Sequence, residues 1–464
     1  MIEIGRRRFL QGASALAASG IVPGLATASA PPARLSDIDH IIVLMKENRS
    51  FDHYFGSLRG VRGFNDPAAQ REGEGSVFRQ ADENHPDGCI LPFRLDTQRT
   101  NAQRLHGLSH AWGAQHAAWN GGAMDKWIPA HRAADGPSGP LPMGYLTRQD
   151  LPFYYALADA FTICDGYHCS VFGPTHPNRY YLMTATINPE GSNGGPVIDN
   201  KTRTYQWETY PERLERAGIS WRIYHDLDDY GCNVCRYFTQ YHDLPQTSGL
   251  FENALRDRPL YELLWDLKTG NIPQVTWIVP PSTVTEHPDY LPAAGEDHTN
   301  QVLQALWSNP ALWAKTALIL NYDENDGQFD HVTPPTPEPG TPGEFVNGQS
   351  IGLGYRVPCL VISPFSRGGY VCSTTFDHTS TLRLIEARFG VEIANLSKWR
   401  RETCGDLTAA FGFGAPAQLD VPPLPETEHA LQIAEERAMS LPQPSVPAKQ
   451  AMPRQEPGSR PRRA

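Results

Sequence analysis

The sequence predicts an α/β fold, a three-layer α/β/α sandwich around a mostly parallel central sheet. Short, continuous apolar runs such as residues 41–45 and 316–322 are typical of strands that are buried on both faces, as in a parallel sheet. These runs alternate with segments of helical periodicity, such as residues 151–161. The 464 residues, 40% of them apolar, are enough for one large domain, although length alone also allows two or three.

The first 30 residues are predicted to be a signal peptide that is removed from the mature protein. Arg6, Arg7 and Arg8 precede a mildly apolar stretch at residues 13–25, and Ala28-Ser29-Ala30 follows as a cleavage site. The stretch is short and rich in Ala, Gly and Ser, which favours cleavage over membrane anchoring. We therefore expect export by the twin-arginine route to the periplasm, the cell surface or the medium.

The remaining chain divides by composition into a catalytic domain, residues 31–413, and a C-terminal tail, residues 414–464. The tail is rich in Pro and Ala, and we expect one short helix at about residues 426–439 with partial disorder around it. Residues 57–105 are polar, contain many Gly, Pro, Asp and Asn residues, and are predicted to form a long surface excursion. The formal net charge of −11 argues against nucleic-acid binding.

The expected elements of the catalytic domain follow from local patterns. A helix is predicted for residues 151–161, because its apolar residues recur at helical spacing. A second helix is predicted for residues 179–184, after a loop at Ser170–Asn178. Apolar runs bounded by turn residues predict further strands at residues 219–224, 275–279, 316–322 and 358–363.

Eight cysteines are present in the chain, and an oxidising compartment would permit disulfides among them. Their pairing cannot be read from spacing. Cys232 and Cys235 form the one close pair, and a zinc ribbon would need a second such pair. A local disulfide or two free thiols are the remaining interpretations.

Three predicted strands run directly into polar side chains that can bind metal ions. Residues 41–45 lead to Glu47 and Asn48, residues 275–279 lead to the loop with Glu286 and His287, and residues 316–322 lead to Asp323 and Glu324. In a parallel sheet the carboxyl ends of the strands share one edge, which is where ligands bind. Carboxylates, an amide oxygen and imidazoles at one edge would suit a divalent cation. Each strand end taken alone is equally typical of a solvated turn.

Thr175 is the candidate nucleophile. Gly173-Pro174 turns the chain, and Pro177 is expected to prevent a helix from continuing through this loop, which leaves Thr175 at its tip. The segment that follows can provide a helix N-terminus, whose N–H groups suit a phosphate. A bound cation would lower the pKa of the hydroxyl group. Taken alone, a threonine here is more typical of a turn or a helix cap.

Four motifs resemble a known family. They are Glu47-Asn-Arg-Ser-Phe-Asp-His-Tyr-Phe-Gly56, Gly173-Pro-Thr-His-Pro-Asn-Arg179, Asp323-Glu-Asn-Asp-Gly-Gln-Phe-Asp-His331 and Phe376-Asp-His-Thr-Ser380. These motifs resemble the bacterial phosphoesterase family, which contains secreted phospholipases C and acid phosphatases. The resemblance extends from about residue 37 to about residue 413, and it implies an alkaline phosphatase-like α/β/α fold.

The resemblance also implies roles for particular residues. Thr175 corresponds to a nucleophile that also contacts the metal, and His110 and His287 correspond to imidazoles that bind phosphate or handle the proton of the leaving group. It implies no clear role for His331 or His378, whose Asp-His pairs are equally typical of buried hydrogen-bonded pairs. The residues that correspond to ligands of one or more divalent metal ions are Glu47, Asn48, Asp323 and Glu324.

The implied activity is that of a secreted phospholipase C that cleaves phosphatidylcholine-like phospholipids. Two alternatives stay open, an acid phosphatase that uses the same site on monoesters and a secreted binding protein without activity. The longer phospholipases C carry additional β-rich C-terminal domains, whereas this sequence ends soon after the catalytic region. Transient contact with a lipid surface would then depend on loops such as 57–105 and 226–260. We also expect the segment Tyr224–Asp229, which includes His225 and Asp226, to lie at the border of the site.

Overall fold

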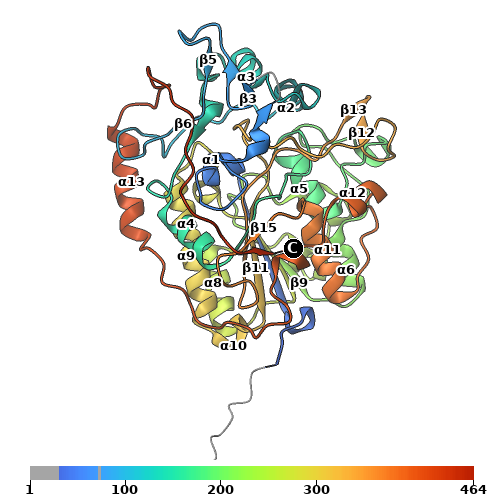
Figure 1. The fold of residues 1–464 in the computed structure, drawn as a ribbon. Coiled ribbons are helices and arrows are strands. Elements are labelled where there is room, and N and C mark those ends of the chain that lie inside the picture. The colour runs from blue at the N-terminus through green and yellow to red at the C-terminus, as the bar shows by residue number, and fades with distance from the viewer. Residues whose placement is uncertain (1–30, 72–74, 464) are drawn as a thin grey trace, which may run out of the picture. The chain divides into compact units, whose positions relative to one another are not determined.

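The computed structural model describes residues 31–71 and 75–463, so the signal peptide predicted for residues 1–30 lies outside the described part. An eight-stranded sheet with the strand order β16-β15-β8-β14-β11-β1-β10-β9 forms its centre (Figure 1). The strands are β1 (His40–Lys46), β8 (Thr162–Cys164), β9 (Trp221–Tyr224), β10 (Val275–Ile278), β11 (Thr316–Tyr322), β14 (Cys359–Ile362), β15 (Val371–Cys372) and β16 (Arg462–Arg463).

The half of the sheet that carries the predicted site is parallel. β1 pairs in parallel with both β10 and β11, and β10 pairs in parallel with β9. β14 runs antiparallel to β11, since the chain between them contains no crossover helix, only the short strands β12 (Phe345–Val346) and β13 (Gln349–Ser350). The predicted mostly parallel sheet is confirmed, with β14 as the strand whose direction the apolar pattern could not give.

Helices cover both faces of the sheet, as a three-layer sandwich requires. In Figure 1 one group lies to the left of the strands and another to the right. The first group is α4 (Pro152–Ala160), α8 (Leu260–Thr269), α9 (Pro292–Trp307), α10 (Pro310–Trp313) and α13 (Glu428–Ser440). The second group is α5 (Thr175–Thr184), α6 (Tyr210–Arg216), α11 (His378–Phe389) and α12 (Lys398–Thr403), with α7 (Gly249–Ala254) packed on α6. The predicted helix at residues 151–161 corresponds to α4.

The helix α5 begins at Thr175, four residues earlier than predicted. The prediction was wrong because it treated Pro177 as a helix breaker. Pro177 lies in the first turn, where backbone N–H groups have no partner within the helix, so proline costs little there. Thr175 is consequently the first residue of a regular helix rather than the tip of a loop.

The C-terminal segment contacts the domain at several points. The helix α13 packs on α9, close to the predicted position. Beyond it, Gln455 donates to the carbonyl groups of Leu58 and Val61, and β16 adds a parallel strand beside β15. Composition alone could not show this, because the acceptors for these side chains belong to distant parts of the chain.

Residues 57–105 are also more integrated than a surface excursion. They contain the short strands β2 (Gln70–Arg71), β3 (Gly75–Ser76), β4 (Gln80–Ala81), β5 (Cys89–Ile90) and β6 (Phe93–Arg94), and β6 pairs with β7 (Gly144–Tyr145). Phe78 is buried, with its ring 6.1 Å from that of Phe329. The helices α1 (Phe51–Phe55), α2 (Trp112–Trp119) and α3 (Trp127–Asp135) complete this part of the molecule.

Across residues 31–71 and 75–463, no helix is both long enough and apolar enough to span a membrane.

Candidate active site and metal-binding cluster

The carboxyl ends of β1 and β11 bring three of the predicted metal ligands together. The two strands are in register, with Lys46 opposite Tyr322, so the residues that follow them are neighbours. The backbone N–H of Asn48 donates to Asp323 Oδ1 over 3.0 Å, and the N–H of Glu324 donates to the same oxygen over 2.8 Å. Asn48 has a φ of 58°, in the left-handed region, which asparagine tolerates better than most residues.

The helix α5 connects the predicted nucleophile to this cluster through Arg179. The guanidinium group of Arg179 donates to Glu47 Oε1 over 2.5 Å and to Asp323 Oδ2 over 3.1 Å. Thr175 lies one turn before Arg179, and residues four apart share a face of a helix. Arg179 ends the Gly173–Arg179 motif, and the motif alone predicted no role for it. Its position four residues after the candidate nucleophile was the available signal.

Three side-chain oxygens in this cluster are buried without a hydrogen-bond partner in the described part of the chain. They are Glu47 Oε2, Asn48 Oδ1 and Glu324 Oε1. Buried acceptors without donors are costly and rare in folded proteins. Two carboxylate oxygens and one amide oxygen are the donor atoms that hard divalent cations such as Mg²⁺ or Ca²⁺ prefer. The residues therefore fit a divalent metal ion.

The electrostatics of the acids also fit a cation. Burial raises the pKa of Asp323 to about 6, with the negative charge of Glu47 adding to the shift and Arg179 opposing it. Burial likewise raises the pKa of Glu324 well above its usual value. Carboxylates crowded in a site of low polarity resist ionising together, and a bound cation would remove that resistance.

His110 lies at the outer side of Glu324. Its Nε2 is 3.8 Å from Glu324 Oε1, and its Nδ1 is 3.4 Å from Asp326 Oδ1. Burial alone would lower the pKa of His110, but these two carboxylates outweigh burial and raise it to about 10. Asp326, which sequence analysis missed, also accepts from the Asn48 amide over 3.2 Å. Its place in the Asp323–His331 motif was the only signal.

His287 faces the same region from the loop after β10. A Cβ atom placed on Gly107 would lie 3.2 Å from His287 Cε1 and 3.5 Å from Asp326 Oδ1, so the two side chains border one space. Burial lowers the pKa of His287, although Asp326 and Asp289 oppose this. The structure thus gathers His110 and His287 around Asp326 at one end of the acidic cluster.

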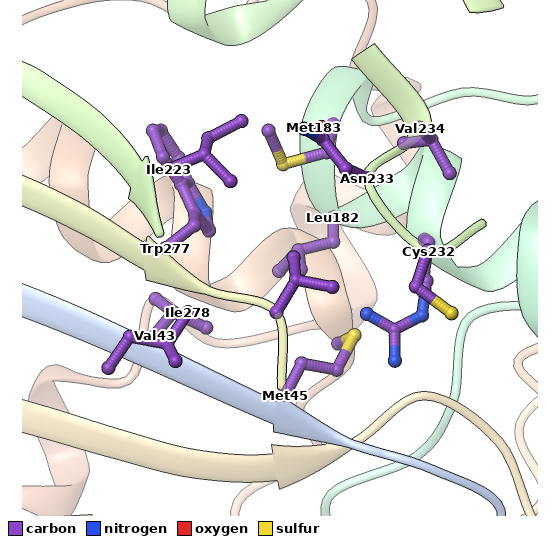
Figure 2. A pocket seen from close by; sticks show the side chains of 12 residues that line it. Val43, Met45, Leu182, Met183, Ile223, Cys232, Asn233, Val234, Trp277 and Ile278 are labelled. Atoms are coloured by element: carbon purple, nitrogen blue, oxygen red, sulfur yellow. The ribbon is translucent and has the colours of Figure 1, made fainter. Parts of the chain in front are cut away.

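The loop after β9 reaches the site through residues other than those predicted. Cys232 donates its thiol hydrogen to Glu47 Oε1 over 2.9 Å, and the ring of Tyr230 is 5.3 Å from that of His287. His225 instead lies buried 3.4 Å from Asp229. Cys232 also lines a small, largely apolar cavity beside the strand ends, with Met45, Leu182 and Ile278 (Figure 2). All eight cysteines are free thiols, so the possible local disulfide is absent.

His378 and His331 make structural contacts that hold the loops of the site. His378 Nε2 donates to the backbone carbonyl of Asp323 over 2.7 Å, and burial lowers the pKa of His378 to about 4. His331 Nδ1 lies 2.6 Å from Asp52 Oδ2. Neither histidine belongs to the cluster around Asp326.

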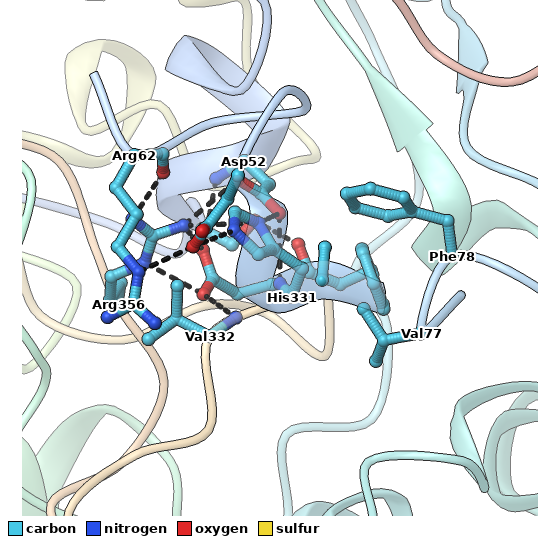
Figure 3. A network of polar contacts seen from close by, with 12 residues as sticks. Asp52, Arg62, Val77, Phe78, His331, Val332 and Arg356 are labelled. Atoms are coloured by element: carbon cyan, nitrogen blue, oxygen red, sulfur yellow. Dashed lines mark hydrogen bonds and ion pairs between the residues drawn. The ribbon is translucent and has the colours of Figure 1, made fainter. Parts of the chain in front are cut away.

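A second buried acidic cluster surrounds Arg356 (Figure 3). Asp52, Asp330 and His331 lie close enough together to hold a metal ion. However, Arg356 already donates to both carboxylates, with Nη2 3.0 Å from Asp52 Oδ1 and Nε 2.9 Å from Asp330 Oδ1. Its guanidinium group provides the positive charge that a metal ion would otherwise supply. This cluster is an ion-pair network.

Comparison with known proteins identifies the family of this chain. The model of the family described as "Phosphoesterase family" matches residues 38–392. The chain belongs to the phosphoesterase family. It is therefore a hydrolase that acts on phosphoric esters, as the four motifs indicated.

The curated relatives share most of their length with this phosphoesterase. It is 44% identical to the non-hemolytic phospholipase C of Pseudomonas aeruginosa, and the match covers 100% of this chain and 71% of the relative. It is 43% identical to phospholipase C B of Mycobacterium tuberculosis, over 91% of this chain and 88% of the relative. The non-specific phospholipase C3 of Arabidopsis thaliana is 26% identical, over 88% of this chain and 80% of the relative.

Solved structures give only distant likenesses. A protein in the alkaline phosphatase superfamily from Vibrio parahaemolyticus has a TM-score of 0.35 at 10% identity, over 82% of this chain and 72% of that one. The phosphonate monoester hydrolase of Silicibacter pomeroyi has a TM-score of 0.28 at 13% identity, over 57% of this chain and 72% of that one. The α/β/α assignment rests on the sheet and helices of the chain itself.

Proposed function

We propose that this phosphoesterase is a phospholipase C that hydrolyses phosphatidylcholine-like phospholipids to diacylglycerol and a phosphorylated headgroup. The relatives named as phospholipases C, at 43–44% identity, support the substrate class. The observation that carries the chemistry is the set of three buried oxygens without donors, next to the helix that begins with Thr175. Such a set suits a site that binds a cation and cleaves a phosphoester.

The metal ion would be held by Glu47, Asn48, Asp323 and Glu324, together with the hydroxyl group of Thr175. When bound, a divalent ion lowers the pKa of a hydroxyl group and stabilises negative charge on phosphoryl oxygens. Arg179 occupies Glu47 Oε1 and Asp323 Oδ2, which leaves Glu47 Oε2 open. The ion-paired Arg179 therefore orients these carboxylates.

Thr175 is proposed as the nucleophile. Its hydroxyl group gives up its proton to water and its oxygen attacks phosphorus, the bond from phosphorus to the diacylglycerol oxygen breaks, and a threonine phosphodiester that still carries the headgroup forms. His110 or His287 gives a proton to the leaving oxygen. Water then attacks phosphorus, one of its protons returns to the threonine oxygen and the other to the histidine, and the phosphorylated headgroup is released. In the first turn of α5 the N–H of His176 already donates to Asn200 Oδ1 over 2.9 Å and Pro177 has no N–H, so the N–H of Thr175 is the donor that we assign to a phosphoryl oxygen.

The decisive experiment compares the purified mature protein on phosphatidylcholine and on a phosphomonoester, each with and without a chelator. We expect cleavage of the diester, its loss on chelation, and its return when a divalent cation is added. Turnover of the monoester alone would replace the proposal with an acid phosphatase. A lack of turnover on both substrates, with metal present, would leave a secreted binding protein.

Contact with a lipid surface is proposed for the loop after β9. Leu227 is 81% exposed and Tyr230 is 46% exposed, and Tyr230 also contacts the ring of His287. An apolar side chain and an aromatic one at the border of a site are suited to the interface of a bilayer. Replacing Leu227 by Asp should lower binding to phosphatidylcholine vesicles in a sedimentation assay. Unchanged vesicle binding would show that this loop does not contact the lipid surface.

Export by the twin-arginine route is proposed from residues 1–30 alone. Replacing Arg6, Arg7 and Arg8 by Lys should leave the protein in the cytoplasm of an expressing bacterium. Cell fractionation and immunoblotting measure this, and normal export of the variant would contradict the proposal.

A further inference from the structure

Three segments leave the sheet at one edge, and each carries a residue of the proposed site. The side chain just before each of these residues points into a second buried cluster, which is centred on Glu286. Lys46 precedes Glu47, Tyr322 precedes Asp323, and Glu286 precedes His287. Lys46, Tyr322 and Glu286 are all at most 1% exposed. Successive side chains at a strand end point to opposite faces of the sheet. The acidic cluster with Arg179 and the cluster around Glu286 therefore occupy opposite sides of the same strand ends.

The carboxylate of Glu286 is the centre of this second cluster. Its Oε2 accepts from Tyr54 over 2.8 Å and from Tyr322 over 2.7 Å. Its Oε1 accepts from the hydroxyl of Tyr154, and the ammonium group of Lys46 lies 3.6 Å away. These partners come from α1, β11, α4 and β1, so one carboxylate connects four elements of the fold.

The backbone of Glu286 is held in an unusual conformation. Its φ is 74°, in the left-handed region that side chains other than Gly and Asn rarely adopt. Arg49 Nε donates to the Glu286 carbonyl over 2.8 Å, and Glu47 N donates to the carbonyl of Thr285 over 2.9 Å. Such a conformation persists only when the surroundings fix it. The direction in which His287 leaves this turn is therefore set by the contacts of Glu286.

Gly295 on α9 makes room for the same carboxylate. A Cβ atom at this position would lie 2.0 Å from Glu286 Oε1, and the Gly295 carbonyl accepts from Lys46 Nζ over 3.1 Å. Any side chain here would displace Glu286. A glycine in the interior of a helix is otherwise unfavourable, so its presence fits a requirement for this space.

We propose that Glu286 is a positioning residue. It fixes the turn that aims His287 at the reacting phosphate, and it holds this turn in place beside Glu47 and Asp323 at the ends of β1 and β11. This inference rests on the proposed function, because His287 acts there on a phosphoester. It assigns no chemistry to Glu286 itself, since the side chain is fully buried and its oxygens accept from three tyrosine hydroxyl groups.

The test is a double-mutant cycle with Glu286→Gln and His287→Ala, assayed on a soluble short-chain phosphatidylcholine. Glutamine keeps the shape but donates where a tyrosine hydroxyl now donates. We expect kcat to fall about 100-fold with little change in KM, as a small misplacement of a catalytic group does. In the His287→Ala background, Glu286→Gln should cost no further activity, because its effect passes through His287. Equal losses in both backgrounds would overturn the proposal.

Four further variants distinguish the positioning role from a simple loss of folding. Gly295→Ala should reproduce the loss of kcat, whereas Gly113→Ala, on α2 with nothing within 4 Å of the new Cβ, should not. Glu296→Gln removes another buried carboxyl group of α9 and should keep kcat. Should Glu286→Gln fail to fold, Tyr54→Phe removes one donor from the same carboxylate, and we expect a smaller loss of kcat that also disappears in the His287→Ala background.

A measurement without turnover separates this proposal from the proposed function. In a ¹H–¹³C spectrum of the imidazole groups, assigned with the His287→Ala variant, Glu286→Gln should shift the His287 resonances and leave those of His168 in place. An unshifted His287 would overturn the positioning role, whatever the activity of the protein. If wild-type protein fails to cleave the substrate while the shift is seen, the proposed function fails and the positioning role stands.

Discussion

Two buried acidic clusters lie on the same pair of segments and differ in how their oxygens are satisfied. The segments that follow β1 and β11 first supply Glu47 and Glu324 to one cluster, then Asp52 (in α1) and Asp330 to the other. Around Arg356, the carboxylate oxygens of Asp52 and Asp330 all accept hydrogen bonds. Around Arg179, one oxygen each of Glu47, Asn48 and Glu324 has no donor in the described structure.

This difference indicates that the cluster around Arg356 stabilises the fold, whereas the cluster around Arg179 is suited to bind a cation. The guanidinium group of Arg356 donates to both Asp52 and Asp330, and the backbone N–H of His331 donates to the second oxygen of Asp52. In the other cluster, a single arginine holds Glu47 and Asp323 by one oxygen each and leaves other acceptors open. By residue types alone, the two clusters are equally good candidates for a metal site. The hydrogen bonds favour the cluster around Arg179.

The largest effect is expected at Thr175, beside the unsatisfied cluster. Thr175→Ala should lower kcat about 1,000-fold, because it removes the oxygen that attacks phosphorus. Thr175→Ser keeps a hydroxyl group and should retain measurable turnover. The circular dichroism spectrum and thermal midpoint should stay close to those of the wild type. Near-normal activity in the alanine variant would exclude Thr175 as the nucleophile.

Glu324→Gln should lower kcat about 100-fold and weaken binding of the divalent cation, measured by isothermal titration calorimetry. The metal-free variant should be as stable as the wild type or more stable, since one of several crowded carboxyl groups has been neutralised. A metal-free variant that is much less stable, with cation affinity unchanged, would show that the clusters have been assigned the wrong way round.

Asp330→Asn tests the satisfied cluster and should give the opposite pattern. Removing one charge leaves the buried Arg356 partly uncompensated, which should lower the free energy of unfolding by about 3 kcal/mol. Cation affinity and kcat of the folded protein should change little. Urea unfolding and calorimetry measure the two quantities side by side, and lost cation binding at unchanged stability would contradict the comparison.

The smallest effect is expected at Glu296, a buried acid outside both clusters. Burial raises its pKa to about 8, against a usual value of 4.5. The folded protein therefore holds a proton that the unfolded chain releases, so this contribution to stability is present below pH 4.5 and is lost as the pH rises towards 8. Between pH 5 and pH 7, the wild type should lose about 2 kcal/mol relative to Glu296→Gln in urea unfolding. Parallel pH profiles of the two proteins would show that Glu296 does not titrate in this way.

The residues that sequence analysis found share a local signal. Glu47, Asn48, Asp323 and Glu324 each follow an apolar run directly, and a buried strand that ends in polar residues is visible in the chain itself. His287 stood out by its place in the loop after a predicted strand, whereas His110 needed the resemblance to the family, because nothing in its own surroundings distinguishes it from other histidines. The strand β8 was missed, since its three residues are too few to form a pattern.

The residues that sequence analysis missed act through contacts between distant segments. Asp326 was visible only as part of a motif, yet it joins His110 and Asn48. Cys232 lies 185 positions from the carboxylate that it contacts. Glu286 was predicted to lie among the metal ligands, but its carboxylate instead accepts from three tyrosines that belong to three elements. Such partners are set by packing, which no local pattern records.

The sequence by itself determined the α/β class, the strands of the parallel half-sheet and the family, because hydrophobic periodicity and long motifs are properties of neighbouring residues. Only the tertiary structure decided which carboxylates are satisfied, that β14 runs antiparallel and that the C-terminal segment joins the sheet. The physical reason is that a hydrogen bond or an ion pair depends on where a distant partner lies. The two acidic clusters show this directly. Each contains an arginine, but the fold places hydrogen-bond donors against all carboxylate oxygens of Asp52 and Asp330 and leaves oxygens of Glu47, Asn48 and Glu324 without a donor in the described structure.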